Sequence, residues 1–267
     1  MTGAGNDFVL IDDRKIGLKR DWAALAPKLC DRRYGIGADG LLVLEVSQSA
    51  DFGMRYYNAD GSYGGMCGNG GRCSARFVMD DAALDTVRFE ALGFTYRAHR
   101  VGSLVKLYMK DPMSFRNDVL HLGDYKIPYT FLDTGTAHAV IFVEDLEPVL
   151  AQMAASGEIQ QIGSEIRNHA AFAPGGTNVN FVRVLDDWTI AMRTYERGVE
   201  AETLACGTGA IATAIVSNLY KQTPVPTRVR TRSKEILEVG FKREGGNFRE
   251  ITLTGSADIV YSGRISV

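Results

Sequence analysis

The feature that most constrains this chain is a motif that occurs twice, as Met66-Cys67-Gly68-Asn69-Gly70 and as Ala205-Cys206-Gly207-Thr208-Gly209. Each copy places a cysteine ahead of Gly-x-Gly and runs directly into a helix-forming stretch. A glycine-rich turn before a helix directs unpaired backbone N–H groups and the positive end of the helix dipole at one point. A cysteine held there is favoured as a thiolate. The repetition predicts two halves, each with one reactive thiol.

The second motif is followed by residues 210–220, which are apolar on nearly every face of a helix. A helix without a polar stripe must be surrounded by protein. After the first motif, apolar periodicity predicts a helix over residues 71–81. Many short strand-like segments surround these two stretches, which favours a β-layer wrapped around one central helix over parallel β-α-β units.

We therefore predict an α+β fold with two pseudo-symmetric domains, each a mostly antiparallel β-barrel or sheet wrapped around a central α-helix. The Asp111-Pro112 dipeptide marks a boundary, because the residue before a proline is pushed out of helical conformation. The expected N-terminal domain is 1–111, joined by a C-terminal strand within 256–267, with its strand signal at 257–261. The expected C-terminal domain is 112–255.

The composition narrows the classes of partner. With 267 residues the chain is long enough for two domains that each bury a core. Lys plus Arg number 30 against 32 Asp plus Glu, and this near-neutral balance argues against nucleic acid or an anionic membrane as a partner. The longest apolar runs are too short to span a bilayer, and the first residues carry no secretory pattern. A cytoplasmic location is the expectation.

The chain has four cysteines, too few for a disulfide scaffold, and they include no C-x-x-C pair. No metal site is expected, because the four histidines do not cluster near Cys67 and Cys73. Cys30 and Cys73 lie on predicted helix faces, where a cysteine acts as a small buried hydrophobe. Cys67 and Cys206 are flanked by glycines and are not needed for packing.

Two such thiols fit the racemisation of an α-carbon, which requires removing a proton on one face and delivering one on the other. The pKa of a thiol is close enough to neutrality for both of its protonation states to be reached. The carboxylate beside the carbanion must take up charge, and backbone N–H groups at helix N-termini can bind it.

Further motifs, spread over the chain in the expected order, resemble those of the diaminopimelate epimerases. They are Gly3-Ala4-Gly5-Asn6-Asp7-Phe8, Gly35-Ile36-Gly37-Ala38-Asp39-Gly40, Asn58-Ala59-Asp60-Gly61-Ser62, the stretch 66–73, Glu196-Arg197-Gly198 and the stretch 205–209. The resemblance implies a homodimeric enzyme without pyridoxal phosphate, metal or other cofactor. It would interconvert LL- and meso-diaminopimelate, a precursor of lysine and peptidoglycan.

The resemblance also implies roles for individual residues. Cys67 and Cys206 become the acid/base pair on opposite faces of the α-carbon. The anion-binding backbone would be Gly68, Asn69, Gly207 and Thr208. His138 becomes a helper near a catalytic thiol.

The distal ammonium and carboxylate of the substrate need their own partners. Arg197 can bind a carboxylate bidentately and Glu196, also implied as a catalytic residue, can accept from an ammonium. The family's amide ligands match Asn6, Asn58 and Asn178.

The chain departs from the family pattern in a few places. Thr136 and Ala137 stand where the family usually has Asn-Pro before the histidine, and Gly40 stands where some members carry glutamine. The stretch 198–205 is one residue longer than in some members. None of these departures touches the thiol pair.

Three other functions compete with this interpretation. Proline racemases and hydroxyproline epimerases use a similar cysteine pair, but typically carry histidine after Cys-Gly where this chain has Asn69, and their substrates lack a distal charge pair. The phenazine-type isomerases lack the cysteine pair. A thiol sensor could instead join Cys67 and Cys206 in a reversible disulfide, but a sensor need not exchange an α-proton. Which thiol is deprotonated at rest is left open by the sequence.

Overall fold

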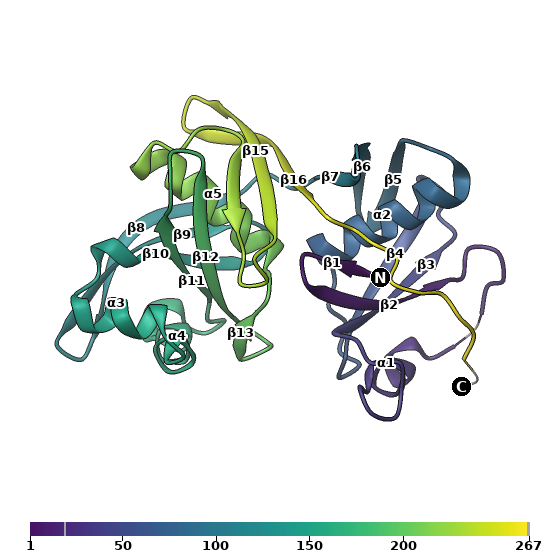
Figure 1. Ribbon diagram of the computed structural model, residues 1–267, viewed down its shortest axis with the longest axis horizontal. Helices are drawn as coiled ribbons and strands as arrows, with labels where there is room; N and C mark the ends of the chain where they lie inside the picture. The colour runs from purple at the N-terminus through teal and green to yellow at the C-terminus, as the bar shows by residue number, and fades with distance from the viewer. Residues whose placement is uncertain (19, 266–267) are drawn as a thin grey trace. The chain divides into compact units, whose positions relative to one another are not determined.

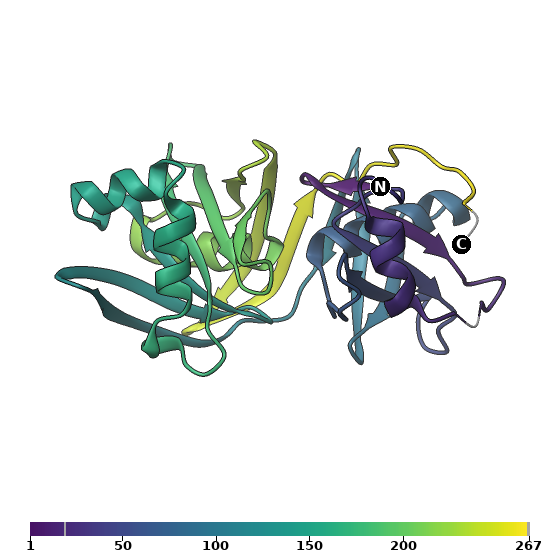
Figure 2. The same cartoon turned by 90° about the horizontal axis from the view of Figure 1, so that it is seen from below.

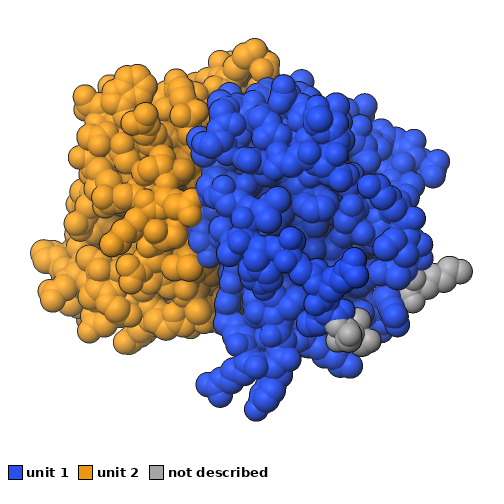
Figure 3. Space-filling model, turned by 45° about the vertical axis from the view of Figure 1, so that its right-hand side comes forward, with its two compact units in different colours: residues 1–109, 254–267 blue, residues 110–253 orange. Residues whose placement is uncertain are grey.

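The computed structural model describes residues 1–18 and 20–265, and its elements are drawn in Figures 1 and 2. It divides into two compact units, which Figure 3 colours separately. Unit 1 comprises Met1–Met109 and the chain from residue 254 onward, and unit 2 is the continuous stretch Lys110–Leu253. Each unit contains a sheet and a buried helix of 15 residues. The α+β class predicted from the sequence is confirmed.

Unit 1 contains, in chain order, β1 (Thr2–Gly3), β2 (Asn6–Asp12), α1 (Trp22–Cys30), β3 (Gly40–Glu45), β4 (Phe52–Asn58), α2 (Gly68–Ala82), β5 (Thr86–Ala91), β6 (Phe94–Val101) and β7 (Leu104–Tyr108). The strands hydrogen-bond in that same order from β1 to β7. The pairs β2/β3 and β4/β5 are parallel, and the other neighbours are antiparallel. Helices α1 and α2 form the crossovers that these two parallel pairs require.

Helix α2 is the centre of unit 1 and contacts every strand from β1 to β7. It approaches its neighbours closely, because a Cβ on Gly71 would lie 2.9 Å from Met66 Cε and 3.2 Å from Phe89 Cζ. Val78 and Met79 extend the same buried core toward the end of the helix. Small residues in the first turns therefore let the sheet close around this helix.

Unit 2 contains, in chain order, β8 (Met113–Leu122), β9 (Tyr125–Asp133), β10 (Ala137–Phe142), α3 (Pro148–Ala155), α4 (Ile159–Arg167), β11 (Asn178–Val184), β12 (Thr189–Glu196), β13 (Ala201–Thr203), α5 (Gly207–Lys221), β14 (Thr227–Arg230), β15 (Ile236–Glu244) and β16 (Asn247–Gly255). Its strands hydrogen-bond in the order β8-β9-β10-β11-β12-β14-β15-β16, and β13 pairs with β12. The parallel pairs are β10/β11, connected through α3 and α4, and β12/β14, connected through α5.

Strand β11 shows how this sheet separates two environments. Val179 and Phe181 face the apolar cluster that also contains residues of α4, where Gly163 lies directly against Tyr195. Side chains alternate along a strand, so Asn180 points the other way, toward the first turn of α5. Helix α5 in turn contacts β9, β10, β11, β12, β14 and β15, as its apolar sequence predicts.

Both central helices begin earlier than predicted. We expected helices over 71–81 and 210–220 with the glycines in a preceding turn, but α2 begins at Gly68 and α5 at Gly207. The glycines form the first helical turn, and Cys67 and Cys206 are the N-cap residues. From the sequence, the glycines are expected outside the helices because glycine has a low helix propensity. In the structure, close packing in the first turn outweighs that propensity.

The strand predicted at 257–261, within 256–267, is wrong. The described part of this segment makes one isolated antiparallel bridge, between Thr2 and Asp258. Strand β1 is only two residues long and gives a partner little backbone to pair with. Ser256 fastens the same segment, since Ala4 N donates to its Oγ at 3.1 Å and Arg72 Nε to its carbonyl at 3.3 Å. Lys19, Ser266 and Val267 of the predicted first domain lie outside the described residues.

Strand β8 was not predicted. Most of its ten residues are exposed, so the sequence shows none of the apolar alternation that signals a half-buried strand. Its place is set by pairing with β9 over nearly its full length.

Candidate active site

Cys67 caps the N-terminus of α2 with an extended backbone, and its side chain is half-buried. Its Sγ accepts a hydrogen bond from Gly70 N at 3.4 Å. This is the geometry of an N-cap, with sulfur in place of the usual oxygen. The unpaired N–H groups and the dipole of the helix favour a negative charge at that sulfur.

Asn6, predicted as an amide ligand, and Asn69, predicted for its backbone, lie together near this thiol. Asn69, in the first turn of α2, donates from Nδ2 to Asn6 Oδ1 on β2. Asn6 in turn donates from Nδ2 to Asp39 Oδ2 at 3.1 Å. The resulting hydrogen-bond network of side chains leads from the helix N-terminus to the surface of unit 1. It fixes the direction in which each amide points.

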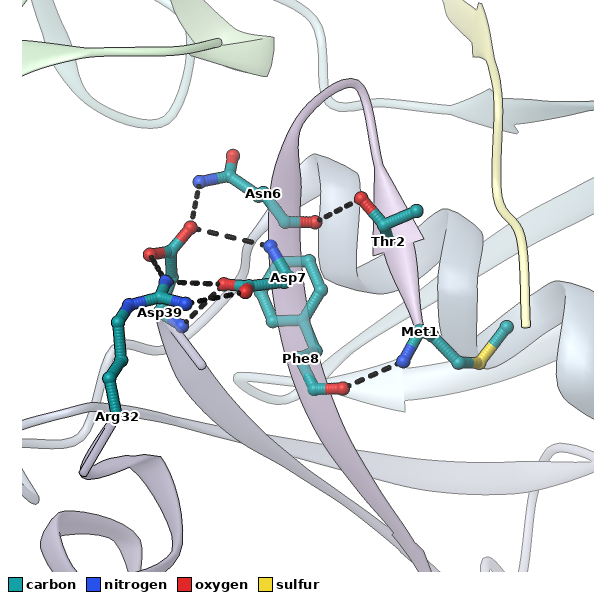
Figure 4. Close-up of polar contacts among 7 residues, drawn as sticks. All are labelled: Met1, Thr2, Asn6, Asp7, Phe8, Arg32 and Asp39. Atoms are coloured by element: carbon teal, nitrogen blue, oxygen red, sulfur yellow. Dashed lines mark hydrogen bonds and ion pairs between the residues drawn. The ribbon is translucent and has the colours of Figure 1, made fainter. Parts of the chain in front are cut away.

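Arg32 and two carboxylates hold the outer end of this chain, as Figure 4 shows. The Arg32 guanidinium donates to both oxygens of Asp7 at 2.8 Å and to Asp39 Oδ1 at 2.8 Å. Burial raises the pKa of the Asp7 carboxyl, but the hydrogen bonds from Arg32 and from the main chain of Asp39 outweigh it and leave that pKa lowered. Asp7 is therefore ionised at neutral pH, and the ion pair orients Asp39 toward Asn6.

Arg72 was not predicted from the sequence. It is fully buried in α2 and donates from Nη2 to Asn69 Oδ1 at 3.0 Å and from Nη1 to the carbonyl of Gly68 at 3.5 Å. The available signal was a charged residue within a helix whose other early residues are small or apolar. Buried charges are retained where they are hydrogen-bonded, and here those bonds position the amide next to Cys67.

Asn58 lies at the end of β4, where it pairs with Gly40 of β3. Its Nδ2 donates to Ser62 Oγ at 2.9 Å. A Cβ on Gly40 would lie 2.5 Å from Tyr56 Cε2 and 2.6 Å from the carbonyl oxygen of Tyr57. The departure from the family pattern at Gly40 thus has a steric reason, because Tyr56 occupies the space that a side chain there would need.

Cys206 is the N-cap residue of α5, also with an extended backbone, and its side chain is buried, with 6% exposed. The cap hydrogen bond that the Cys67 sulfur accepts from Gly70 N has no counterpart at the start of α5, all of whose residues are described. Its Sγ lies 3.5 Å from Thr208 Oγ1. The following glycine is required, because a Cβ on Gly209 would lie 2.5 Å from Asn180 Oδ1 and 3.3 Å from the sulfur. Gly207, Thr208 and Gly209 therefore form a close-packed first turn around this thiol.

His138 lies fully buried on β10, near the same helix N-terminus. Its Nε2 is 2.9 Å from Thr136 Oγ1 and its Nδ1 is 3.0 Å from Asn180 Nδ2. Burial, aided by the charge of Arg197, lowers the pKa of His138 to about 3. The imidazole is therefore neutral at physiological pH. Thr136 also donates to Thr208 Oγ1 at 3.2 Å, which links His138 to the first turn of α5.

The predicted residues Asn178, Glu196 and Arg197 form a second group, where β11 begins and β12 ends. Asn178 accepts at Oδ1 from Arg197 N at 2.8 Å and donates from Nδ2 to the carbonyl of Ala137 at 3.0 Å. The Arg197 guanidinium donates to the carbonyl of Gly175 at 3.1 Å. Glu196 accepts at Oε2 from Thr203 Oγ1 at 2.9 Å. These bonds hold Glu196, a group that can bind an ammonium, and Arg197, a group that can bind a carboxylate, at adjacent positions of the sequence.

Besides Arg72, sequence reasoning missed Asn180 and Thr134. Asn180 bonds His138, and Thr134 Oγ1 donates to the carbonyl of Thr208 at 3.0 Å. A signal for Asn180 existed, because Asn178 and Asn180 are two apart on a predicted strand and so lie on one face. Thr134 has no comparable pattern around it.

Cys30 and Cys73 stand apart from the two helix-capping thiols. Both are buried, and burial raises the pKa of Cys30 to about 11 and that of Cys73 to about 12. They remain protonated at neutral pH. Within residues 1–18 and 20–265, three or more His, Cys, Asp or Glu side chains nowhere gather in a way that could hold a metal ion. Over the same residues, every helix is too short or too polar to cross a membrane.

Three comparisons with known proteins bear on this site. The sequence profile of the family described as diaminopimelate epimerase matches residues 1–111 and 130–260. A curated diaminopimelate epimerase of Chlorobaculum tepidum is 43% identical over 272 residues, which cover 100% of both chains.

Among solved structures, a phenazine biosynthesis protein of the PhzF family from Bacillus anthracis covers 96% of this chain and 92% of its own, with a TM-score of 0.68 at 13% identity. A probable proline racemase from Agrobacterium radiobacter covers 96% and 87%, with a TM-score of 0.65 at 16% identity. At these identities the two structures share the fold alone.

Proposed function

The chain belongs to the diaminopimelate epimerase family, and from this premise we propose that it interconverts LL- and meso-diaminopimelate by a two-base mechanism. The family resemblance and the enzyme class expected from the sequence, an amino-acid epimerase, are confirmed by the full-length match to a curated relative. Family membership also connects the reaction to lysine biosynthesis. The observation that carries the mechanism is the equivalent position of Cys67 and Cys206, each the N-cap of a buried 15-residue helix.

In the proposed reaction one thiolate removes the α-proton and the other thiol delivers a proton to the opposite face of the same carbon. The first sulfur becomes a thiol and the second becomes a thiolate, so the two cysteines have exchanged protonation states after one turnover. Thiols suit both roles because each protonation state is reachable near neutral pH. The reverse reaction uses the same two groups in exchanged roles.

The carbanion that forms next to the α-carboxylate needs an electrostatic partner. Backbone N–H groups in the first turns of α2 and α5, at Gly68, Asn69, Gly207 and Thr208, are proposed to bind this carboxylate. Fixed donors that point at a developing negative charge stabilise the transition state without reorganising.

The other end of the substrate carries an ammonium and a carboxylate. We assign Arg197 to the carboxylate and Glu196 to the ammonium, and the amides Asn6, Asn58 and Asn178 to polar contacts with the bound molecule. His138 is proposed to assist a thiol from its buried position. Support comes from the hydrogen bonds that already hold these side chains in fixed orientations.

We also propose how the protein is organised. Domains 1–111 with 256–267, and 112–255, would each carry one of the two thiols. The family resemblance favours a homodimer, and the composition favours a cytoplasmic enzyme without a nucleic-acid partner.

The test is proton exchange with solvent. Reduced protein is incubated in deuterated water with LL-diaminopimelate and no added cofactor. The α-carbon of the substrate should acquire deuterium while the meso isomer forms. Absence of both labelling and isomer formation would overturn the epimerase function and leave a thiol sensor as the better explanation. L-proline and trans-4-hydroxy-L-proline serve as controls and should remain unlabelled.

A further inference from the structure

We infer that Thr136 is a positioning residue for Cys206: its hydroxyl turns the hydroxyl proton of Thr208 toward the Cys206 sulfur and so favours the thiolate form of Cys206. This inference deepens the proposed two-base function and rests on it. Thr136 is a residue at which the chain departs from its family's usual sequence, and the two-base mechanism gave it no task.

The direction of each hydrogen bond can be worked out from groups that can only donate or only accept. Asn180 Nδ2 lies 3.4 Å from the carbonyl oxygen of Ala139, which can only accept, and Asn180 Oδ1 accepts from Thr194 Oγ1 at 2.9 Å. The amide orientation of Asn180 is thereby fixed. Its other N–H donates to His138 Nδ1, so this ring nitrogen is an acceptor and carries no proton.

A neutral imidazole carries one proton, which must then be on His138 Nε2. That nitrogen donates to Thr136 Oγ1 at 2.9 Å. Asn178 Nδ2 approaches the same oxygen at 3.4 Å. The amide orientation of Asn178 is fixed too, because Arg197 N can only donate to its Oδ1 and the carbonyl of Ala137 can only accept from its Nδ2.

A hydroxyl has two lone pairs and one proton. Both lone pairs of Thr136 accept, from His138 and from Asn178, so its single proton is available only for donation. Thr208 Oγ1 lies 3.2 Å away and receives it. The proton of Thr208 is then directed at the Cys206 sulfur, 3.5 Å away.

The chain of donors therefore ends on sulfur as an acceptor. A hydrogen bond to a charged acceptor is roughly twice as strong as one to a neutral acceptor, so the bond from Thr208 favours the thiolate over the thiol. The corresponding position in the first motif is Asn69, whose amide is engaged by Asn6 and Arg72. The Cys67 sulfur accepts from the backbone N of Gly70 at 3.4 Å, so the two sulfurs accept from different kinds of donor.

Charged groups also lie on β12, which packs against α5, and on β13, which pairs with β12. Glu196 and Arg197 lie at the end of β12, and Glu202 lies on β13, where it pairs with Arg193. Substitutions at Thr136 leave all of them in place. A difference between variants at this position therefore reports the hydroxyl alone.

The test measures the thiolate directly in substrate-free protein, by its ultraviolet absorbance as a function of pH. In a Cys67→Ala background the signal comes from Cys206, because Cys30 and Cys73 titrate only near pH 11 and 12. Thr136→Val should move the titration midpoint up by about one pH unit and slow alkylation by iodoacetamide at neutral pH about tenfold. Thr136→Ser, which keeps the hydroxyl, should restore the parent midpoint.

In the reciprocal Cys206→Ala protein, which reports Cys67, Thr136→Val should leave the titration midpoint unchanged. In the enzyme with both thiols, Thr136→Val should move the acid limb of kcat/KM upward equally in both reaction directions, because the equilibrium constant fixes their ratio. Circular dichroism and thermal unfolding establish that each variant is folded. Thr136→Ala provides the hydroxyl-free comparison if the valine variant fails to fold.

Two results would overturn the inference: an unchanged Cys206 midpoint on loss of the hydroxyl, or an equal shift of the Cys67 midpoint in the Cys206→Ala protein. Both are obtained without substrate. Loss of deuterium exchange with an intact thiolate titration would overturn the proposed function instead. Normal exchange with an unaffected Thr136→Val titration would remove the inference and leave the function standing.

Discussion

The two helix N-termini share one motif but surround their cysteines with different chemistry. At the start of α2, Asn69 leads through Asn6 to the carboxylate of Asp39 and the Arg32 ion pair. At the start of α5, Thr208 leads through Thr136 to a neutral, fully buried His138. The motif residue that differs, Asn69 or Thr208, thus determines the hydrogen-bond network that begins at each helix. The network from Asn69 consists of amides and charged groups, and the network from Thr208 begins with hydroxyls.

Two contributions set the protonation state of each thiol: the helix dipole, and the side chains and burial around the sulfur. Both helices have 15 residues, so the helix dipole favours a thiolate at either cysteine. At Cys67 the backbone N of Gly70 also donates to the sulfur. The side chains and the burial differ, since Cys206 is buried and Cys67 is half-buried. Unequal thiols suit a reaction in which one group must start as base and the other as acid.

The largest expected effect comes from removing either thiol. Cys67→Ala and Cys206→Ala should each lower the rate of epimerisation by at least about 10³-fold, because each removes the acid or base on one face. Each variant keeps one base and should exchange the α-proton of one isomer without inverting it, and the two variants should label opposite isomers. Nuclear magnetic resonance in deuterated water distinguishes the isomers. Labelling of the same isomer by both would show that the thiols do not act on opposite faces.

A smaller effect is expected from alanine at equivalent glycines of the two first turns. Gly209→Ala places a Cβ 2.5 Å from Asn180 Oδ1, an atom held by its hydrogen-bonded neighbours, whereas Gly70→Ala places one 2.8 Å from Leu42 Cδ2, the end of a flexible side chain. We expect Gly209→Ala to lower the free energy of unfolding by about 1–3 kcal/mol. Gly70→Ala should cost less, since Leu42 can shift and alanine favours the helix. Urea denaturation of both variants gives the comparison, and equal losses would contradict it.

The two sites should also differ in how their contribution to stability changes at acidic pH. The pKa of His138 is lowered to about 3 in the folded protein from 6.5, so the unfolded chain binds the extra proton in that range. Its contribution to stability is therefore complete above pH 6.5 and decreases as the pH falls, by about 2 kcal/mol at about pH 5. The lowered pKa of Asp7 acts only in more acidic solution, below its ordinary value of 3.8.

Urea denaturation at pH 7 and at about pH 5 measures this difference. In His138→Asn the slope of stability against pH should flatten over that range, whatever the variant's absolute stability. A slope equal to that of the parent protein would show that another group carries the acid sensitivity.

The smallest effect is expected at Arg32, the outer end of the hydrogen-bond network that begins at Asn69. Arg32 is exposed, with 58% of its side chain accessible, so Arg32→Gln should change the free energy of unfolding by at most about 1 kcal/mol. The loss should nevertheless raise KM a few-fold, because Asp39 and then Asn6 lose their fixed orientation. Arg55→Gln, which breaks an exposed ion pair with Glu45, is the matched control and should leave KM unchanged. Equal KM values for both variants would disconnect Arg32 from the substrate site.

The sequence predicted what depends on local pattern. The duplicated motif located both thiols, and the apolar face of residues 210–220 predicted a central helix that the structure confirms. The contacts of Thr136 could not be predicted, because the direction of its proton depends on residues of two neighbouring strands, His138 and Asn178. Arg72 was missed for a similar reason, since its partner Ser256 is 184 residues away in the chain.

The return of the chain after residue 254 has a consequence for how the protein is made. Unit 2 is one uninterrupted stretch, whereas unit 1 needs the last segment, which Arg72 and Ala4 bind through Ser256. Domains fold as units during synthesis from the N-terminus, so unit 2 can complete its fold while unit 1 still waits for its final contacts. The contacts around the helix that carries Cys67 therefore cannot be complete before residue 256 has been made, although the helix itself, residues 68–82, is made early.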